Sequence, residues 1–149
     1  MDAKIRKATV EDLESIVANN IAMARETEGK ELDPVKAEEG ARAVLEGKAD
    51  AVYYVVEVDG KVACQTMITK EWSDWRNGYF WWIQSVYTLP EYRGKGLFRR
   101  LYEYVMAEAR KAGACGLRLY VDAGNTGAQK VYEKLGMSRT NYILYEVEF

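Results

Sequence analysis

A glycine-rich stretch of the chain reads Pro90-Glu91-Tyr92-Arg93-Gly94-Lys95-Gly96-Leu97-Phe98-Arg99-Arg100. It follows an apolar run at 81–89 that is typical of a buried strand, and it opens a segment with one apolar helical face. That face contains Leu97, Phe98, Leu101, Tyr102, Val105, Met106, Ala109 and Ala112. A glycine-containing turn between a strand and a helix presents backbone N–H groups at the positive end of the helix dipole. The stretch therefore predicts an anion site, although a basic turn without a ligand would have the same composition.

The composition is that of an ordinary globular domain, and we expect residues 1–149 to form a single domain. The net charge is −2, so the charge balance favours neither nucleic acid nor a membrane as a partner. The first residues lack a signal-peptide pattern, and no apolar run is long enough to span a membrane. We therefore expect a cytoplasmic protein.

The chemistry open to the chain is limited by the absence of histidine. This absence excludes His-based catalytic triads, His general bases and His metal ligands. Cys64 and Cys115 lie far apart in apolar contexts, so we expect two buried free thiols and no metal site.

The order of the expected elements indicates an α/β domain with a mixed sheet. A first strand at 4–8 is followed by two helices, which begin after Thr9 and at Asp33–Pro34. Two strands joined by Asp59–Gly60 form a hairpin, and a third strand occupies 79–89. The remaining elements are the helix after the glycine-rich turn, a strand at 117–121, a short helix after Asn125 and a last strand at 141–149.

Two motifs, in this order, give the chain a resemblance to the GNAT superfamily of acetyl-CoA-dependent N-acetyltransferases. One is Arg93-Gly94-Lys95-Gly96-Leu97-Phe98, which is similar to the family's Arg/Gln-x-x-Gly-x-Gly/Ala pyrophosphate loop. The other is Asn125-x-x-Ala128-x-x-x-Tyr132-x-x-x-Gly136, which follows a strand. The element order matches the family over the whole chain. Phe98 departs from the small residue of the loop pattern, and we expect its backbone to face phosphate while its ring faces the core.

The resemblance implies a GNAT-like fold with a mixed, mostly antiparallel sheet of six to seven strands, about four helices and splayed central strands. It also implies acetyl-CoA as co-substrate and no metal. The pyrophosphate would be held by the backbone N–H groups of Arg93, Gly94, Lys95, Gly96, Leu97 and Phe98. Backbone groups of Val86, Tyr87 and Thr88 would pair with the pantetheine arm as if it were an added strand, and Asn125 would also contact the cofactor.

The implied reaction is direct transfer of an acetyl group from the thioester to a primary amine. The amine must lose a proton before it attacks, since an alkyl ammonium has a pKa of about 10. Tyr132 would protonate the leaving thiolate, although its place on an apolar helix face also suits a core residue. The strand before the turn carries no carboxylate, so the candidate bases are Glu26, Glu28, Glu31 and Asp74. A solvated acidic loop without a catalytic role and a water chain without a dedicated base are the alternatives.

Aromatic residues just before the glycine-rich turn suggest an acceptor site. Trp75 and Trp81 would form an aromatic wall for a cationic amine, and Gln84 could hold a water molecule. We expect a small-molecule amine between the tryptophan-containing loop and the connection at 26–33. Some of these aromatic residues could instead belong to the core.

Other functions stay open at this point. A non-catalytic acyl-CoA-binding or sensor domain would keep the turn without the acceptor chemistry, and the missing strand carboxylate favours that reading. A protein or peptide N-acetyltransferase would share every motif. The exposed aromatic residues and the last strand would also suit a homodimer.

Overall fold

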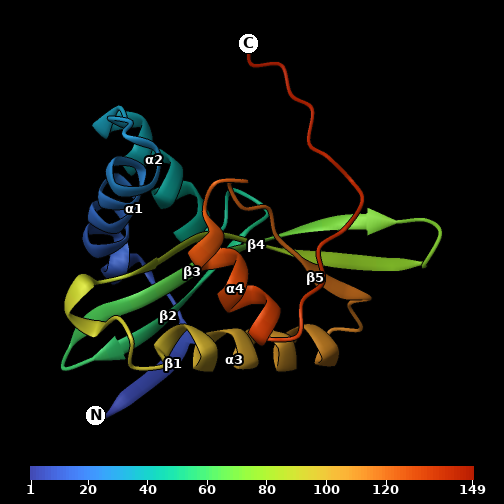
Figure 1. The fold of residues 1–149 in the computed structure, drawn as a ribbon. Helices are drawn as coiled ribbons and strands as arrows, with labels where there is room; N and C mark the ends of the chain where they lie inside the picture. The colour runs from blue at the N-terminus through green and yellow to red at the C-terminus, as the bar shows by residue number, and fades with distance from the viewer. The chain divides into compact units, whose positions relative to one another are not determined.

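The computed structural model describes residues 1–149, and Figure 1 shows its fold. Internal contacts divide the chain into two compact units, residues 1–119 and 120–149. The helices are α1 (Leu13–Glu28), α2 (Pro34–Leu45), α3 (Leu97–Lys111) and α4 (Thr126–Lys134), with short 3₁₀ turns at η1 (Val10–Asp12) and η2 (Pro90–Tyr92). The expectation of about four helices is confirmed.

The first unit is built on a sheet of five strands in the order β1-β2-β3-β4-β5. The strands are β1 (Ala3–Lys7), β2 (Val52–Val58), β3 (Lys61–Ser73), β4 (Gly78–Thr88) and β5 (Gly116–Arg118). Every pair is antiparallel except β4 with β5, which is parallel. The mixed, mostly antiparallel character of the sheet is therefore confirmed.

The expected number of six to seven strands is wrong, since the sheet has five. The segment at 141–149, expected as the last strand, pairs with no other strand, and all its residues are exposed. Its apolar side chains include Tyr142, Ile143, Leu144, Tyr145, Val147 and Phe149. Alternating apolar residues are typical of a β-strand, but a strand also needs the free edge of a neighbouring strand to pair with. The sequence pattern of the segment does not show whether such an edge is present.

The helix starts follow the sequence signals. Asp33 Oδ1 accepts hydrogen bonds from the backbone N–H groups of Val35 (2.9 Å) and Lys36 (3.3 Å), with Pro34 in the first turn of α2. Thr9 and Asp12 form a capping box at η1, in which Asp12 Oδ2 accepts from the Thr9 N–H at 2.8 Å. Local hydrogen bonding therefore sets where the chain enters α1 and α2.

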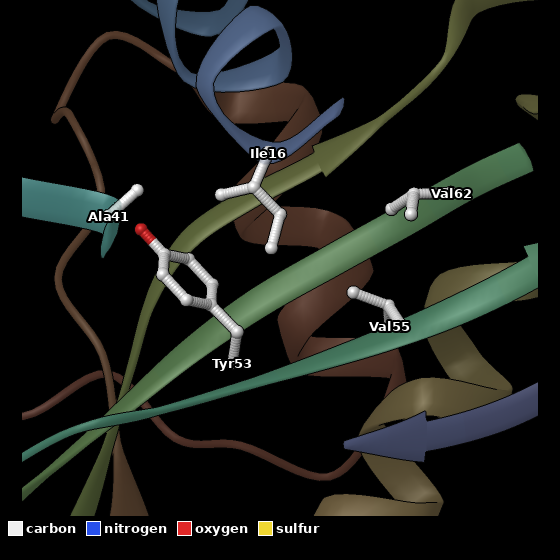
Figure 2. Close-up of a cluster of buried hydrophobic side chains, with 5 residues drawn as sticks. All are labelled: Ile16, Ala41, Tyr53, Val55 and Val62. Atoms are coloured by element: carbon white, nitrogen blue, oxygen red, sulfur yellow. The ribbon is translucent and has the colours of Figure 1, made fainter. Parts of the chain in front are cut away.

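One face of the sheet packs against α1 and α2. Figure 2 shows the buried cluster on this face, made of Ile16, Ala41, Tyr53, Val55 and Val62. Because successive strand residues point to opposite faces, Tyr54 lies on the other face, which α3 covers. The buried residues of α3 are Leu97, Leu101, Tyr102, Val105 and Ala109. This arrangement places the glycine-rich turn where the chain passes from β4 onto the α3 face.

The two hairpins differ in reach. Asp59 and Gly60 join β2 to β3 with φ of 50° and 75°, as the sequence predicts for a tight hairpin turn. The hairpin of β3 and β4 is longer and carries Trp75 at its turn, where the side chain is 85% exposed. Figure 1 shows this hairpin extending past the helices of the first unit.

The cysteine expectation is correct for one residue only. Cys64 is buried, and burial raises the pKa of its thiol to about 11. Cys115 is exposed, because it lies in the connection between α3 and β5 rather than in an element. No three His, Cys, Asp or Glu side chains are grouped so as to hold a metal ion. None of the helices combines the length and the apolar character needed to cross a bilayer.

Candidate functional site

The glycine-rich turn joins η2 to α3 and has the backbone of an anion site. Gly94 and Gly96 adopt left-handed conformations with φ of 74° and 76°, which a side chain would strain. A Cβ at either position would meet no atom within 4 Å, so the space beside the turn is open. Arg100 donates the first helical hydrogen bond, to Gly96 O at 3.2 Å. The N–H groups that precede it at the start of α3 point along the helix axis toward the turn.

The side chains that follow the glycines divide between core and surface. Leu97 is buried under the sheet, whereas Phe98 is only half-buried and packs near Tyr102, with ring centres 6.3 Å apart. The expectation that Phe98 points into the core is thus met only in part. Lys95 is exposed, with its Nζ 5.6 Å from the centre of the Tyr92 ring.

β4 leaves one edge open next to the turn. Its parallel pairing with β5 covers only Phe80 to Trp82, although β4 continues to Thr88. Leu89 N donates to Ala63 O at 2.9 Å, and by alternation Tyr87 also faces β3. The backbone groups of Thr88 and Val86 therefore point to the open side. Tyr87, expected to contact the pantetheine arm through its backbone, instead pairs with Gln65 of β3.

The open edge of β4 contains a bulge. Ser85 has a φ of 51°, and the pairing of β3 with β4 shifts register between Gln65 and Met67. The side chain of Gln65 donates to Ser85 O at 3.3 Å, and Thr66 Oγ1 donates to Gln84 O at 2.8 Å. Side chains of β3 thus hold the carbonyls on both sides of the Gln84–Ser85 step.

Gln65 connects this bulge to α1. Its side chain is fully buried, accepts from Asn19 Nδ2 at 3.0 Å and donates to Asn20 Oδ1 at 2.9 Å. Every hydrogen-bonding atom of this buried amide has a partner, which is what a polar group inside the core requires. The expected acceptor-side residue Gln84 lies on the α1 face as well, where its side chain donates to Thr69 Oγ1.

Glu26, at the end of α1, forms a closed set of contacts with the turn. Arg93 Nη2 donates to Glu26 Oε2 at 2.8 Å, and the Tyr87 hydroxyl donates to Glu26 Oε1 at 3.0 Å. Arg93 Nε donates to Thr88 O at 2.9 Å. The Arg93 guanidinium, followed by the Tyr87 hydroxyl, holds the pKa of Glu26 below its usual range, and burial opposes this shift. We call the side chains of Glu26, Tyr87 and Arg93, with the Thr88 carbonyl, the arginine clasp.

The other candidate bases are exposed acids near the end of α1 or in the β3–β4 turn. Glu28 Oε1 lies 3.7 Å from Lys30 Nζ, and Glu31 pairs with Arg25 at 2.8 Å. Asp74 is exposed in the turn between β3 and β4. The structure thus pairs the three glutamates of this region with cations.

The residues expected to bind the acceptor are not brought together. Trp81 is 7% exposed on the α3 face, Gln84 lies on the α1 face, and Trp75 lies at the tip of the hairpin. Trp82, next to Trp81, donates from Nε1 to Glu71 Oε1 at 3.0 Å. An aromatic wall made of Trp75 and Trp81 is therefore not present in the first unit.

Trp81 instead lines a cavity of about 400 Å³ near the C-terminal end of α3, far along that helix from the glycine-rich turn. Apolar walls come from residues such as Tyr54 and Ile68, and the rim carries Lys7, Lys70, Lys111, Asp50 and Glu108. Lys70 Nζ lies 5.5 Å from the centre of the Trp81 ring. The rim carries three ammonium groups against two carboxylates, so its charge does not favour a cationic amine.

The second motif lies in the second unit, at α4. Asn125 caps this helix, because its Oδ1 accepts from the Ala128 N–H at 3.1 Å. Tyr132 is half-buried, and burial raises the pKa of its hydroxyl above the ordinary value of 10.0. Within the unit, Asn125 therefore has a structural task, and Tyr132 keeps its proton at neutral pH.

Sequence reasoning did not find Gln65, Ser85 or the task of Glu26. A polar residue amid the apolar run 62–68 was a usable signal for Gln65, since a buried amide needs partners. The bulge at Ser85 has no local signal, because serine is not a residue type that favours positive φ. The pairing of Glu26 with Arg93 joins residues far apart in the sequence, so no spacing rule predicts it.

With the turn, the open strand edge and the second motif described, comparison with known proteins identifies the class. The model of the acetyltransferase (GNAT) family matches residues 17–137. The chain belongs to this family.

Two solved structures illustrate the match in fold. A possible acetyltransferase from Clostridium difficile 630 is 44% identical, with a TM-score of 0.91 over 99% of this chain and 97% of that one. A predicted acetyltransferase from Clostridium acetobutylicum, solved with acetyl-CoA, is 19% identical, with a TM-score of 0.80 over 98% of this chain and 96% of that one. At that lower identity, the second structure shows the fold alone.

The curated relatives are similar to this chain over only part of their own length. A mycothiol acetyltransferase of Thermobispora bispora is 46% identical over 60 residues, which is 38% of this chain and 20% of that protein. One of Corynebacterium glutamicum is 38% identical over 68 residues, which is 43% of this chain and 23% of that protein. The matched segment thus spans about a fifth of these relatives.

Proposed function

We propose that the chain transfers an acetyl group from acetyl-CoA to a primary amine of a small molecule. The observation that carries the proposal is the continuity of the open β4 edge with the glycine-rich turn. A ligand with an extended arm that ends in an anion can pair with the open β4 edge through its arm and bind the glycine-rich turn through its anion. Acetyl-CoA has these two parts, a pantetheine arm and a pyrophosphate. Membership of the acetyltransferase family supports acetyl transfer, and the C. acetobutylicum structure with acetyl-CoA supports the donor.

The residues of the first unit fit such a donor. The open space beside Gly94 and Gly96 gives a phosphate close access to the backbone, and the exposed Lys95 adds positive charge. When bound, acetyl-CoA supplies an activated acyl thioester. The chain supplies the N–H groups of 94–98 to the phosphates, and it supplies both backbone groups of Val86 and the N–H of Thr88 to the arm.

The proton transfers are assigned to side chains. Because burial raises its pKa, Tyr132 is protonated at neutral pH, as a donor to a leaving thiolate must be. Glu28 is the proposed acceptor of the amine proton, since its contact with Lys30 at 3.7 Å is longer than the Glu26–Arg93 contact at 2.8 Å. The aromatic residue that we propose to face an incoming amine is Trp75, which is exposed and free of the core.

The test is release of free CoA thiol from acetyl-CoA across a panel of small amines and peptides with free N-termini. We expect turnover with one or more small amines. Tyr132→Phe should lower kcat about 10²-fold or more, the range expected for a lost general acid, with CoA affinity unchanged. Turnover with peptides alone would replace the small-molecule acceptor by a protein, and turnover by Tyr132→Phe equal to the wild type would overturn the assignment of the acid.

A sensor domain is the second candidate, and one observation favours it. No carboxylate lies on β4 between Gly78 and Thr88, and the glutamates at the end of α1 are paired with cations. Such a domain would bind acetyl-CoA tightly and release no thiol with any amine or peptide. Calorimetric binding in the absence of turnover across the panel would support this function over the enzyme.

A further inference from the structure

We propose that Glu26 is a positioning residue of the donor site, which holds Arg93 against the end of β4 and thereby fixes the glycine-rich turn. This inference rests on the proposed use of acetyl-CoA. It replaces the expectation that Glu26 accepts the amine proton, and it links the end of α1 to the phosphate-binding backbone.

The arginine clasp closes on itself. One carboxylate oxygen of Glu26 accepts from Tyr87 and the other accepts from Arg93, at 3.0 and 2.8 Å. Arg93 reaches back to the Thr88 carbonyl at 2.9 Å, and Thr88 follows Tyr87 directly on β4. The guanidinium carbon lies 5.4 Å from the centre of the Tyr87 ring. Three contacts therefore hold the Arg93 side chain, and the Tyr87–Glu26 hydrogen bond holds its carboxylate partner. Ion pairs and hydrogen bonds that share groups in this way reinforce one another.

The turn needs such an anchor. Glycine has the widest conformational freedom of any residue type, and Arg93 lies directly before the first of the two glycines, Gly94. With Arg93 bound to α1 and to β4, the chain enters the two glycines from a fixed position. Preformed N–H groups bind an anion more tightly, because the turn loses less conformational freedom on binding.

The clasp also sets which groups of the open edge are used. The Thr88 carbonyl points to the open side of β4, and Arg93 Nε occupies it. The groups left for an added strand are the Thr88 N–H and both backbone groups of Val86. The clasp therefore defines where strand-like pairing with a bound arm stops and where phosphate binding begins.

A general base at Glu26 does not fit these contacts. Both oxygens of Glu26 accept hydrogen bonds from its own chain, and these hydrogen bonds favour the carboxylate over its protonated form, which makes it a poorer proton acceptor. The nearby guanidinium further favours the anionic form. These contacts keep the Glu26 carboxylate ionised and fix its position.

Calorimetry with CoA alone and steady-state kinetics together test the inference. Glu26→Ala removes the clasp, Glu26→Gln keeps an acceptor for Arg93, and Arg93→Ala removes the group that Glu26 positions. The matched control is Glu38→Ala on α2, because the side chains of the Glu38–Arg42 pair are 38% and 49% exposed, close to 41% and 47% for Glu26 and Arg93. All titrations are repeated at about 0.5 M salt, where repulsion between Glu26 and phosphate is screened.

At high salt we expect Glu26→Ala to raise the Kd for CoA about 5-fold, which corresponds to about 1 kcal/mol. Glu26→Gln should lie between Glu26→Ala and the wild type, Glu38→Ala should equal the wild type, and Glu26→Ala combined with Arg93→Ala should equal Arg93→Ala alone. In kinetics, the KM for acetyl-CoA should rise, while kcat at saturation and its pH profile stay as in the wild type.

Two other results would overturn the inference. Unchanged CoA affinity in Glu26→Ala, with kcat lost equally in the Ala and Gln variants and the acidic limb of the pH profile altered, would make Glu26 the base. A wild-type chain with no measurable affinity for CoA would overturn the proposed function and this inference with it. The first result leaves the proposed function standing, so the two failures are distinguishable.

Discussion

Replacing the buried amide of Gln65 by an apolar side chain of similar size tests how the bulge in β4 is held. Gln65→Leu removes three hydrogen bonds, to Asn19, Asn20 and the Ser85 carbonyl. Asn20 is half-buried and can turn to water, whereas Asn19 is 5% exposed and cannot. The Ser85 carbonyl, at a residue with a φ of 51°, also loses a partner.

The magnitude follows from the two groups left without partners. Each buried polar group deprived of its hydrogen bond costs about 1.5 kcal/mol, within a range of about 1–3, so the variant should lose about 3 kcal/mol of unfolding free energy. For a domain of this size, the loss corresponds to a fall in Tm of about 9 °C, at about 3 °C per kcal/mol. The leucine leaves little cavity, so the loss reports hydrogen bonding rather than packing.

Urea and thermal unfolding followed by circular dichroism would measure the loss. The control is the pair Asn19→Leu with Gln65→Leu, which removes both partners of one hydrogen bond and should be less destabilised than the sum of the single variants. A loss below about 0.5 kcal/mol for Gln65→Leu would refute the reasoning, since surface substitutions already reach that size. It would mean that water replaces the amide and that Gln65 does not hold the bulge.

Further predictions concern charge and glycine. The Arg6 guanidinium lowers the pKa of Asp12, and burial opposes this shift. The contribution of ionised Asp12 to the free energy of unfolding is therefore present above the unfolded-state pKa and is lost as pH falls through the folded-state pKa. Urea titrations from pH 7 to 2 should show this loss in the wild type but not in Asp12→Asn. Gly116→Ala should destabilise the β4–β5 pairing by about 1–3 kcal/mol, because its Cβ would lie 2.8 Å from the Phe80 ring, and a chemical denaturation midpoint equal to that of the wild type would contradict this. In Gly96→Ala the new Cβ contacts no neighbouring atom, but the alanine must adopt a φ of 76°. We therefore expect about 1 kcal/mol of strain and weaker CoA binding by calorimetry. A CoA affinity equal to that of the wild type would show that the turn can adopt another backbone conformation.

The elements with local causes could be predicted from the sequence. The Asp59–Gly60 turn, the Asp33 cap and the helix after Gly96 depend on residues within a few positions of one another, and the structure has all three. The strand at 141–149 failed for the opposite reason. Its alternation describes the surface of a possible strand, but a strand exists only where a second backbone supplies hydrogen bonds.

The site was predictable to the extent that it depends on backbone. Two glycines after an arginine were enough to place the glycine-rich turn, because φ and the helix start follow from sequence. Side-chain roles were harder, since they are fixed by partners distant in the chain. Glu26 contacts Arg93 and Tyr87, which are distant from it in the sequence. Trp81 does not line an acceptor site with Trp75, because the strand register places it under α3.

The uneven sequence distances within the sheet have a consequence for how the chain folds. β2, β3 and β4 are consecutive and joined by tight turns, so their pairing closes only short loops. The chain between β1 and β2 contains α1 and α2, so pairs such as Ala3–Val58 close a long loop. The chain between β4 and β5 contains α3, so their pairing also closes a long loop. Closing longer loops costs more chain entropy, so we expect the three-stranded meander to form in the folding transition state and β1 and β5 to dock afterwards. The strand that carries the open edge would then be among the first parts of the molecule to be made, and the clasp that fixes its end among the last.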